Sequence, residues 1–68
     1  MENYYVHKLT DNKGDHEVHV EGCNKMTVSE NFKNLGQFSN CRADVAEAKK
    51  NYNQVNGCFY CCNECHTQ

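Results

Sequence analysis

The sequence is short of the residues that usually build a protein core. It has no isoleucine, and leucine, valine and phenylalanine together make up 11 of its 68 residues. It has no apolar run long enough to cross a membrane. It also lacks a basic surplus, because seven Lys and Arg stand against nine Asp and Glu for a net charge of -2. These absences argue against a membrane protein and against a nucleic-acid-binding protein, which usually carries a basic surface.

A single domain over residues 1–68 is all that this length allows. A domain this small with so thin a core usually needs a staple, either disulfides or a bound metal. Six cysteines are present to supply one. Four of the six fall within the last eleven residues, in a segment that we call the cysteine tail (residues 57–68, "GCFYCCNECHTQ").

The N-terminal stretch "MENYYVHKLT" has neither the basic start nor the apolar run of a secretory signal. We therefore expect a cytoplasmic protein. Cytosolic thiols are mostly kept reduced, so clustered cysteines there more often bind metal than form disulfides. An exported, disulfide-stapled domain is the alternative interpretation.

Three segments have the composition of β-strands. Residues 3–9 are rich in Tyr, Val and Leu, and residues 16–23 alternate between apolar and polar. Residues 10–15, "TDNKGD", have the composition of a hairpin turn, so these two strands are predicted to pair. Residues 24–33 lack a clear period and are interpreted as a loop, and residues 34–38 are predicted to form a short third strand.

One helix is predicted at residues 41–53. Ser39 or Asn40 is placed to cap it, and Asp44 lies near the positive end of the helix dipole. One stripe at helical spacing is expected to face the sheet: Cys41, Val45, Ala48 and Tyr52. The expected fold class is α+β, a small antiparallel sheet of about three strands with one packed helix and a C-terminal cysteine knuckle.

The cysteines that meet can be predicted from the order of the elements. If strands and helix run up and down in turn, Cys23 at the end of the second strand and Cys58 after the helix share one pole. Cys41 is then expected at the other pole, about 18 Å away along the helix. The spacing Cys58-x-x-Cys61 favours two convergent thiolates. The predicted metal site consists of Cys23, Cys58, Cys61 and Cys65, with Cys62 and His66 as alternates for the last ligand.

Four thiolates, or three thiolates and one imidazole, suit Zn²⁺. A closed shell of four protein ligands would make the ion structural. His19 is not expected to take part, because on a straight strand it lies about 13 Å from Cys23 unless Gly22 folds the chain sharply. Cys41 is expected to be a small buried thiol; a thiol activated by the helix N-terminus is the alternative.

Two other chemistries fit parts of the cysteine tail. The pattern Cys62-x-x-Cys65-His66 matches covalent haem attachment, but five residues match easily by chance where cysteine is this dense. A C-x-x-C pair also exchanges disulfides, but redox proteins of that kind place it at the start of a helix, whereas here it follows one. Thiol-disulfide exchange is the one enzymatic interpretation that we retain, and we do not expect an enzyme.

Three stretches of the chain carry a resemblance: "GDHEVHVEGC", "LGQFSNCRADVAEAKK" and "NGCFYCCNECHT", within residues 14–67. Together they resemble a family of small uncharacterised bacterial proteins with a GDHEVH strand, an LG-x-F strand before an Ala-rich helix and a GC-x-x-C-C-x-x-C-H ending. That family has no assigned activity. A looser similarity, in the order strand-cysteine, helix and C-x-x-C, is to the metal-binding domain of Ada-type DNA-repair proteins. The chain lacks their second cysteine a few residues after Cys23, so methyl-acceptor chemistry and DNA binding are not implied.

The sequence thus predicts a small zinc-binding structural or interaction module. An unidentified protein is a possible partner, and binding to nucleic acid or to a membrane is not expected. A thiol-disulfide redox protein and an exported disulfide-stapled domain are the alternatives.

Overall fold

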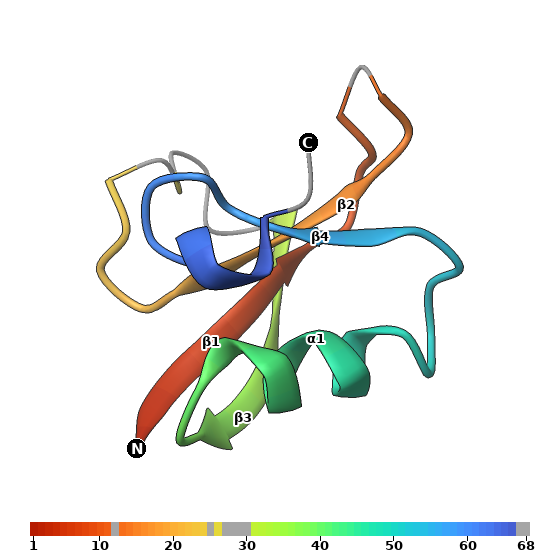
Figure 1. Cartoon of the computed structure of the whole chain (residues 1–68). Coiled ribbons are helices and arrows are strands. Elements are labelled where there is room, and N and C mark those ends of the chain that lie inside the picture. The colour runs from red at the N-terminus through yellow and green to blue at the C-terminus, as the bar shows by residue number, and fades with distance from the viewer. Residues whose placement is uncertain (12, 25, 27–30, 67–68) are drawn as a thin grey trace.

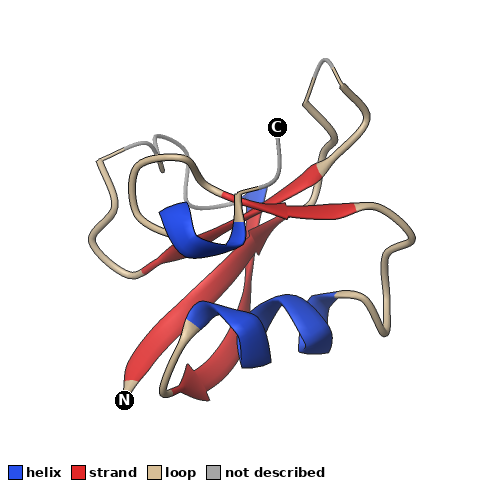
Figure 2. Ribbon diagram, viewed as in Figure 1, coloured by secondary structure: helices blue, strands red, loops and turns tan. Residues whose placement is uncertain are grey.

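The computed structural model describes residues 1–11, 13–24, 26 and 31–66 (Figures 1 and 2). Four strands form one sheet: β1 (Glu2–His7), β2 (His16–Val20), β3 (Phe32–Phe38) and β4 (Val55–Gly57). One helix, α1 (Cys41–Ala48), and one 3-10 turn, η2 (Asn63–Cys65), complete the described elements. The predicted α+β class is confirmed, with four strands in a mixed sheet in place of three antiparallel ones.

The predicted hairpin of β1 and β2 is confirmed. The two strands pair antiparallel, with Tyr4 opposite Val20 and Val6 opposite Val18. In the connecting turn, the Asp11 carboxylate accepts hydrogen bonds from two backbone amides at 2.9 Å. An aspartate that bonds the backbone two residues on is a common turn device, and it sets the register of the pair.

The third strand lies on the far side of β1, in the order β3-β1-β2-β4. It begins at Phe32, two residues before the predicted start at residue 34, so the predicted loop 24–33 is too long at its end. Residues 25 and 27–30 of that loop lie outside the described part of the chain. Tyr4 pairs with Gly36 but Tyr5 pairs with Asn34, so the strand bulges between them. Gly36 takes a φ of 109°, which a residue with a side chain rarely adopts.

This strand order corrects the expected position of Cys41. Since β2 and β3 both pair antiparallel with β1, they run in the same direction and end at the same pole. The expectation of a separate pole assumed that each element pairs with the one before it in the chain. Cys41, which follows β3, therefore lies at the pole where Cys23 follows β2.

The fourth strand carries the chain back to this pole. Helix α1 runs away from it, and β4 then returns in parallel with β2, with Val55 opposite His16 and Gly57 opposite Val18 (Figure 1). A three-residue strand of sequence Val-Asn-Gly has no alternation long enough to be recognised from the sequence. It matters because it delivers Cys58 beside β2.

Helix α1 begins where it was expected and ends early. Asn40 caps it, its Oδ1 accepting from the Ala43 amide at 3.1 Å. The regular helix stops at Ala48 and continues as turns to residue 51, so the predicted helix 41–53 is too long. Cys41 and Ala48 are buried as predicted. Among the helices of the described part of the chain, none has the length and apolar character needed to cross a bilayer.

One helix residue is buried against expectation. Asp44, predicted only to favour the helix dipole, has none of its surface exposed. Neither of its carboxylate oxygens has a hydrogen-bond partner among the described residues. Burial raises the pKa of this carboxyl group to about 7.

Cysteine is a main component of the core. The fully or nearly buried apolar side chains are Tyr4, Val6, Val18, Cys41, Ala48, Cys58 and Cys62, and Cys23, Cys61 and Cys65 pack against them half-buried. All six cysteines thus occupy positions that aliphatic side chains fill in larger domains. A core with so few aliphatic side chains contributes little hydrophobic stabilisation, so cross-links between its sulfurs matter more.

Candidate metal centre

Four side chains converge at the pole where β2 and β4 end. The ligand atoms of His19, Cys23, Cys58 and Cys61 all lie within 4.8 Å of one another. Cys23 Sγ is 3.9 Å from Cys58 Sγ, and Cys61 Sγ is 3.7 Å from His19 Nδ1. A tetrahedral zinc ion with ordinary Zn–S and Zn–N bonds needs its ligand atoms about 3.6–3.8 Å apart. These four residues, which we call the metal centre, are spaced to hold such an ion.

Two of the four come from the end of β2. The strand stops at Val20, and a tight turn follows in which the Cys23 amide donates to the Val20 carbonyl at 3.1 Å. Gly22 takes a φ of 90° in this turn. The chain therefore reverses after Val20, so Cys23 points back towards His19 instead of continuing away from it.

The expected separation of His19 from Cys23 was wrong for this reason. The distance of about 13 Å assumed a straight strand over four residues, and the turn at Gly22 removes that separation. His19 is also buried, with only 3% of its surface exposed. Its ring packs edge-on to Phe32, with centroids 5.4 Å apart. The signal in the sequence for this arrangement was Gly22, which stands directly before Cys23 and can turn the chain back towards His19.

The other two side chains come from the C-x-x-C motif after β4. The Cys58 amide donates to the Val18 carbonyl at 2.9 Å, which fixes the start of the motif on β2. Cys61 Sγ then accepts from the Val20 amide at 3.4 Å. The predicted proximity of Cys23, Cys58 and Cys61 is confirmed.

The His19 ring is oriented by a neighbouring carboxylate. With Nδ1 towards Cys61, its Nε2 lies 3.3 Å from Glu17 Oε1. A carboxylate that accepts from the outer ring nitrogen fixes the tautomer and aims the inner nitrogen at a metal. Burial, with a smaller contribution from His7, lowers the pKa of His19 to about 4. The imidazole is neutral at pH 7, which is the form that binds metals.

Burial also raises the pKa values of two thiols at this pole. Burial, with a hydrogen bond to Cys23, raises the pKa of Cys61, and burial raises the pKa of Cys62 to about 11. Thiols in such surroundings are poor nucleophiles, because exchange and catalytic cysteines have lowered pKa values. A divalent cation is the partner that would favour their deprotonated form.

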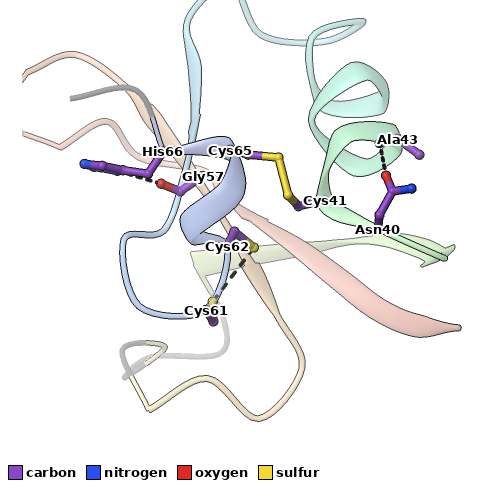
Figure 3. Close-up of a disulfide and its surroundings, with 8 residues drawn as sticks. All are labelled: Asn40, Cys41, Ala43, Gly57, Cys61, Cys62, Cys65 and His66. Carbon is purple, nitrogen blue, oxygen red and sulfur yellow. Dashed lines mark hydrogen bonds between the residues drawn. A yellow bond between two sulfur atoms is a disulfide. The ribbon is translucent and has the colours of Figure 1, made fainter.

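The fourth ligand predicted from the sequence has another partner. Cys65 is bonded through sulfur to Cys41, with Cα atoms 6.3 Å apart (Figure 3). Cys41 is buried as predicted, but as one half of a disulfide and not as a free thiol. The bond was not foreseen because Cys41 was placed at the opposite pole. Metal and disulfide were weighed as alternative staples, whereas the structure contains both a disulfide and a group of residues suited to a metal.

The two alternates for the last ligand lie outside the metal centre. Cys62 is a buried free thiol with its Sγ 3.9 Å from that of Cys61. The Nδ1 of His66 lies 3.0 Å from the Gly57 carbonyl oxygen (Figure 3). The three residues of the haem-like pattern thus have three different roles: Cys62 is a free thiol, Cys65 is in a disulfide, and His66 lies beside a backbone carbonyl.

The tail folds closely onto Gly57. A Cβ atom at this residue would lie 2.7 Å from the Cys62 carbonyl oxygen and 2.9 Å from Cys65 Cβ. Real Cβ atoms essentially never approach other heavy atoms this closely, so only glycine, which has no side chain, fits at this position without a shift of the tail. The close approach lets the tail turn back directly after β4.

Comparisons with models of protein families, with curated proteins and with solved structures found no match to this chain.

Proposed function

We propose that this chain is a zinc-binding module in which the ion staples the ends of β2 and β4 together. The observation that carries the proposal is the convergence of His19, Cys23, Cys58 and Cys61, whose ligand atoms lie within 4.8 Å of one another. Two ligands come from each of two segments that are far apart in the sequence. An ion bound to all four would close the sheet at this pole.

Zinc is favoured by the donor set. Three thiolates and one imidazole form one of the standard ligand sets of structural zinc, and hard cations such as Mg²⁺ or Ca²⁺ prefer oxygen. All four tetrahedral positions are supplied by the protein, so none is left for water or substrate. The ion is therefore proposed to be structural, and its binding free energy to add to the folding free energy.

The small hydrophobic core explains why this fold would need a bound metal for stability. Only Val6, Val18 and Ala48 are completely buried aliphatic side chains in the described part of the chain. A small domain of this kind is commonly unfolded or loosely folded without its metal. The raised pKa values of the Cys61 and Cys62 thiols weigh against the competing thiol-exchange function.

An interaction role for the module is supported by the surface of the C-x-x-C turn. Phe59 and Tyr60, between the two cysteine ligands, have 54% and 67% of their surface exposed. Large aromatic side chains at the surface are enriched in protein interfaces. An ion bound to Cys58 and Cys61 would hold the two rings in place.

Titration of the metal-free protein with Co²⁺ tests the proposal, without oxygen so that the four thiols stay reduced and without reductant so that the disulfide stays intact. One Co²⁺ per chain is expected, with the strong visible bands of a tetrahedral site and thiolate-to-cobalt charge transfer, and Zn²⁺ should displace it. The variants H19A and C58S should each lose the tetrahedral spectrum, whereas H16A, on the same strand, should keep it. A protein with four free thiols that gives no such spectrum would rule the proposal out.

A further inference from the structure

The cysteine tail carries two kinds of cross-link within eight residues. Cys58 and Cys61 belong to the metal centre, and Cys65 forms the disulfide with Cys41. Figure 3 shows the disulfide joining η2 to the start of α1, with Cys61 and Cys62 on the loop that leads into η2. One short segment is thus fastened at one end to β2 and at the other to the helix.

Hydrogen bonds make this segment a single unit. The Cys62 amide donates to the Cys58 carbonyl at 2.8 Å, and the Cys65 amide donates to the Cys62 carbonyl at 2.9 Å. The Asn63 side chain donates to the Phe59 carbonyl at 3.1 Å. A displacement of Cys65 is therefore passed to the residues between Cys58 and Cys61.

The packing against β4 connects the same two cross-links. Cys65 Cβ and the Cys62 carbonyl oxygen both occupy the space that a side chain on Gly57 would need, and Gly57 directly precedes the Cys58 ligand. No side chain lies between the disulfide-bonded residue and the strand end that positions Cys58. The position of Cys65 on Gly57 is held by the bond to Cys41.

We infer that the Cys41–Cys65 disulfide and the metal centre are thermodynamically linked, so that the chain is a zinc site whose affinity is set by thiol redox state. The inference rests on the proposed zinc binding. With the disulfide formed, the tail is already ordered when the ion arrives. With it reduced, zinc must order the tail as well, and that cost lowers the affinity.

The redox step needs a thiol reductant. Two thiols of the glutathione class give up two electrons and two protons, the Cys41–Cys65 bond breaks, both cysteines become thiols, and the reductant leaves as its own disulfide. A hollow of about 330 Å³ beside the bond is lined by Cys41, Cys61 and Cys62 among other residues. Cys65 itself is half-buried and is not among the residues that line this hollow. A small thiol that enters this hollow would approach the bond from the Cys41 side.

Competition with a chromophoric chelator tests the linkage by comparing zinc affinities. The double variant C41S/C65S is expected to bind zinc about 5- to 150-fold more weakly than the oxidised wild type, the usual range of coupling between two sites. The variant C62S removes the one cysteine of the tail that belongs to neither the metal centre nor the disulfide. Its zinc affinity is expected to stay within about threefold of that of the wild type. Equal affinities for the wild type and the double variant would overturn the inference and leave the zinc site standing, as would an equal loss in C62S.

A reciprocal measurement on the wild type does not depend on the folding of any variant. Linkage requires that zinc favour the disulfide by the same factor by which the disulfide favours zinc. In glutathione buffers, the ratio of reduced to oxidised glutathione at half-reduction should rise when zinc replaces chelator, as counted by thiol alkylation and mass. An unchanged ratio would overturn the inference. Failure of the oxidised wild type to bind zinc at all would instead defeat the proposed function.

Discussion

The buried carboxyl group of Asp44 should make this fold less stable as pH rises. None of the side chain is exposed, and its oxygens find no hydrogen-bond donor in the described part of the chain. Burial is the main cause of the raised pKa of Tyr4 in β1 and of Cys62 in the tail, and the charge of Asp44 adds to it. The carboxylate form is therefore disfavoured in the folded state, and the substitution D44N replaces it with a neutral side chain of the same shape.

The expected magnitude follows from the pKa. Burial raises the pKa of Asp44 from 3.8 to about 7, so the folded protein binds one more proton than the unfolded chain between these values. Stability contributed by the neutral form is present below pH 3.8 and is lost as pH rises through 7. At about 1.4 kcal/mol for each pH unit between these two values, the loss is about 4 kcal/mol or slightly more. That is a large share of the total stability of a small domain.

The assay is urea unfolding of the wild type and D44N at several pH values, with the difference taken at each pH. His19, whose pKa is lowered to about 4, changes stability in the opposite direction over part of this range. Taking the difference removes that contribution, since it is common to both proteins. D44N should gain over the wild type up to about pH 7, and the gain should then level off.

The variant E47Q serves as the control for this prediction. Glu47 lies on the outer side of the same helix and pairs with Lys50 Nζ at 3.1 Å. An exposed pair of this kind is worth at most about 1 kcal/mol, so E47Q should show no comparable gain. A difference between the wild type and D44N that does not vary with pH would refute the account of Asp44.

Three further substitutions test other parts of the structure. G57A should weaken zinc binding measured by chelator competition, because the added Cβ would lie 2.7 Å from the Cys62 carbonyl oxygen; an unchanged affinity would show that the tail tolerates the displacement. E17Q should lower zinc affinity by about 10- to 100-fold through loss of the carboxylate that orients His19. E21Q removes the same charge from an exposed residue just after β2, and an equal loss there would contradict the orienting role. N40A should lower the unfolding free energy by about 1 kcal/mol in urea titrations, because the Ala43 amide loses its cap.

The local elements of the fold could be predicted from the sequence. The hairpin followed from two strand-like segments around an Asp- and Gly-containing turn, and the helix start followed from Asn40. These signals act over a few residues and are visible in any one sequence. The end of the helix at Ala48 and the fourth strand, Val55–Gly57, were missed because both depend on where the chain packs.

The errors in placing the cysteines have one origin, which is long-range strand order. Three of the converging cysteines were identified, although the expected route assumed that the helix itself led to Cys58. The pairing of β3 with β1 places Cys41 at the same pole, and the parallel strand β4 brings the tail back to it. Which strands become neighbours depends on the whole chain, and neither composition nor spacing contains that information. His19 was left out of the candidate site for a different reason, because a straight strand was assumed across Gly22.

Native mass spectrometry of the folded, freshly purified protein tests the central claim most directly, with a count of free thiols beside it. We expect one zinc ion that a chelator removes, a protein mass lower by two hydrogens for one disulfide, and four free thiols, on Cys23, Cys58, Cys61 and Cys62. The substitution C61S should abolish the bound zinc. A protein with these four thiols free and no affinity for added zinc would contradict the account.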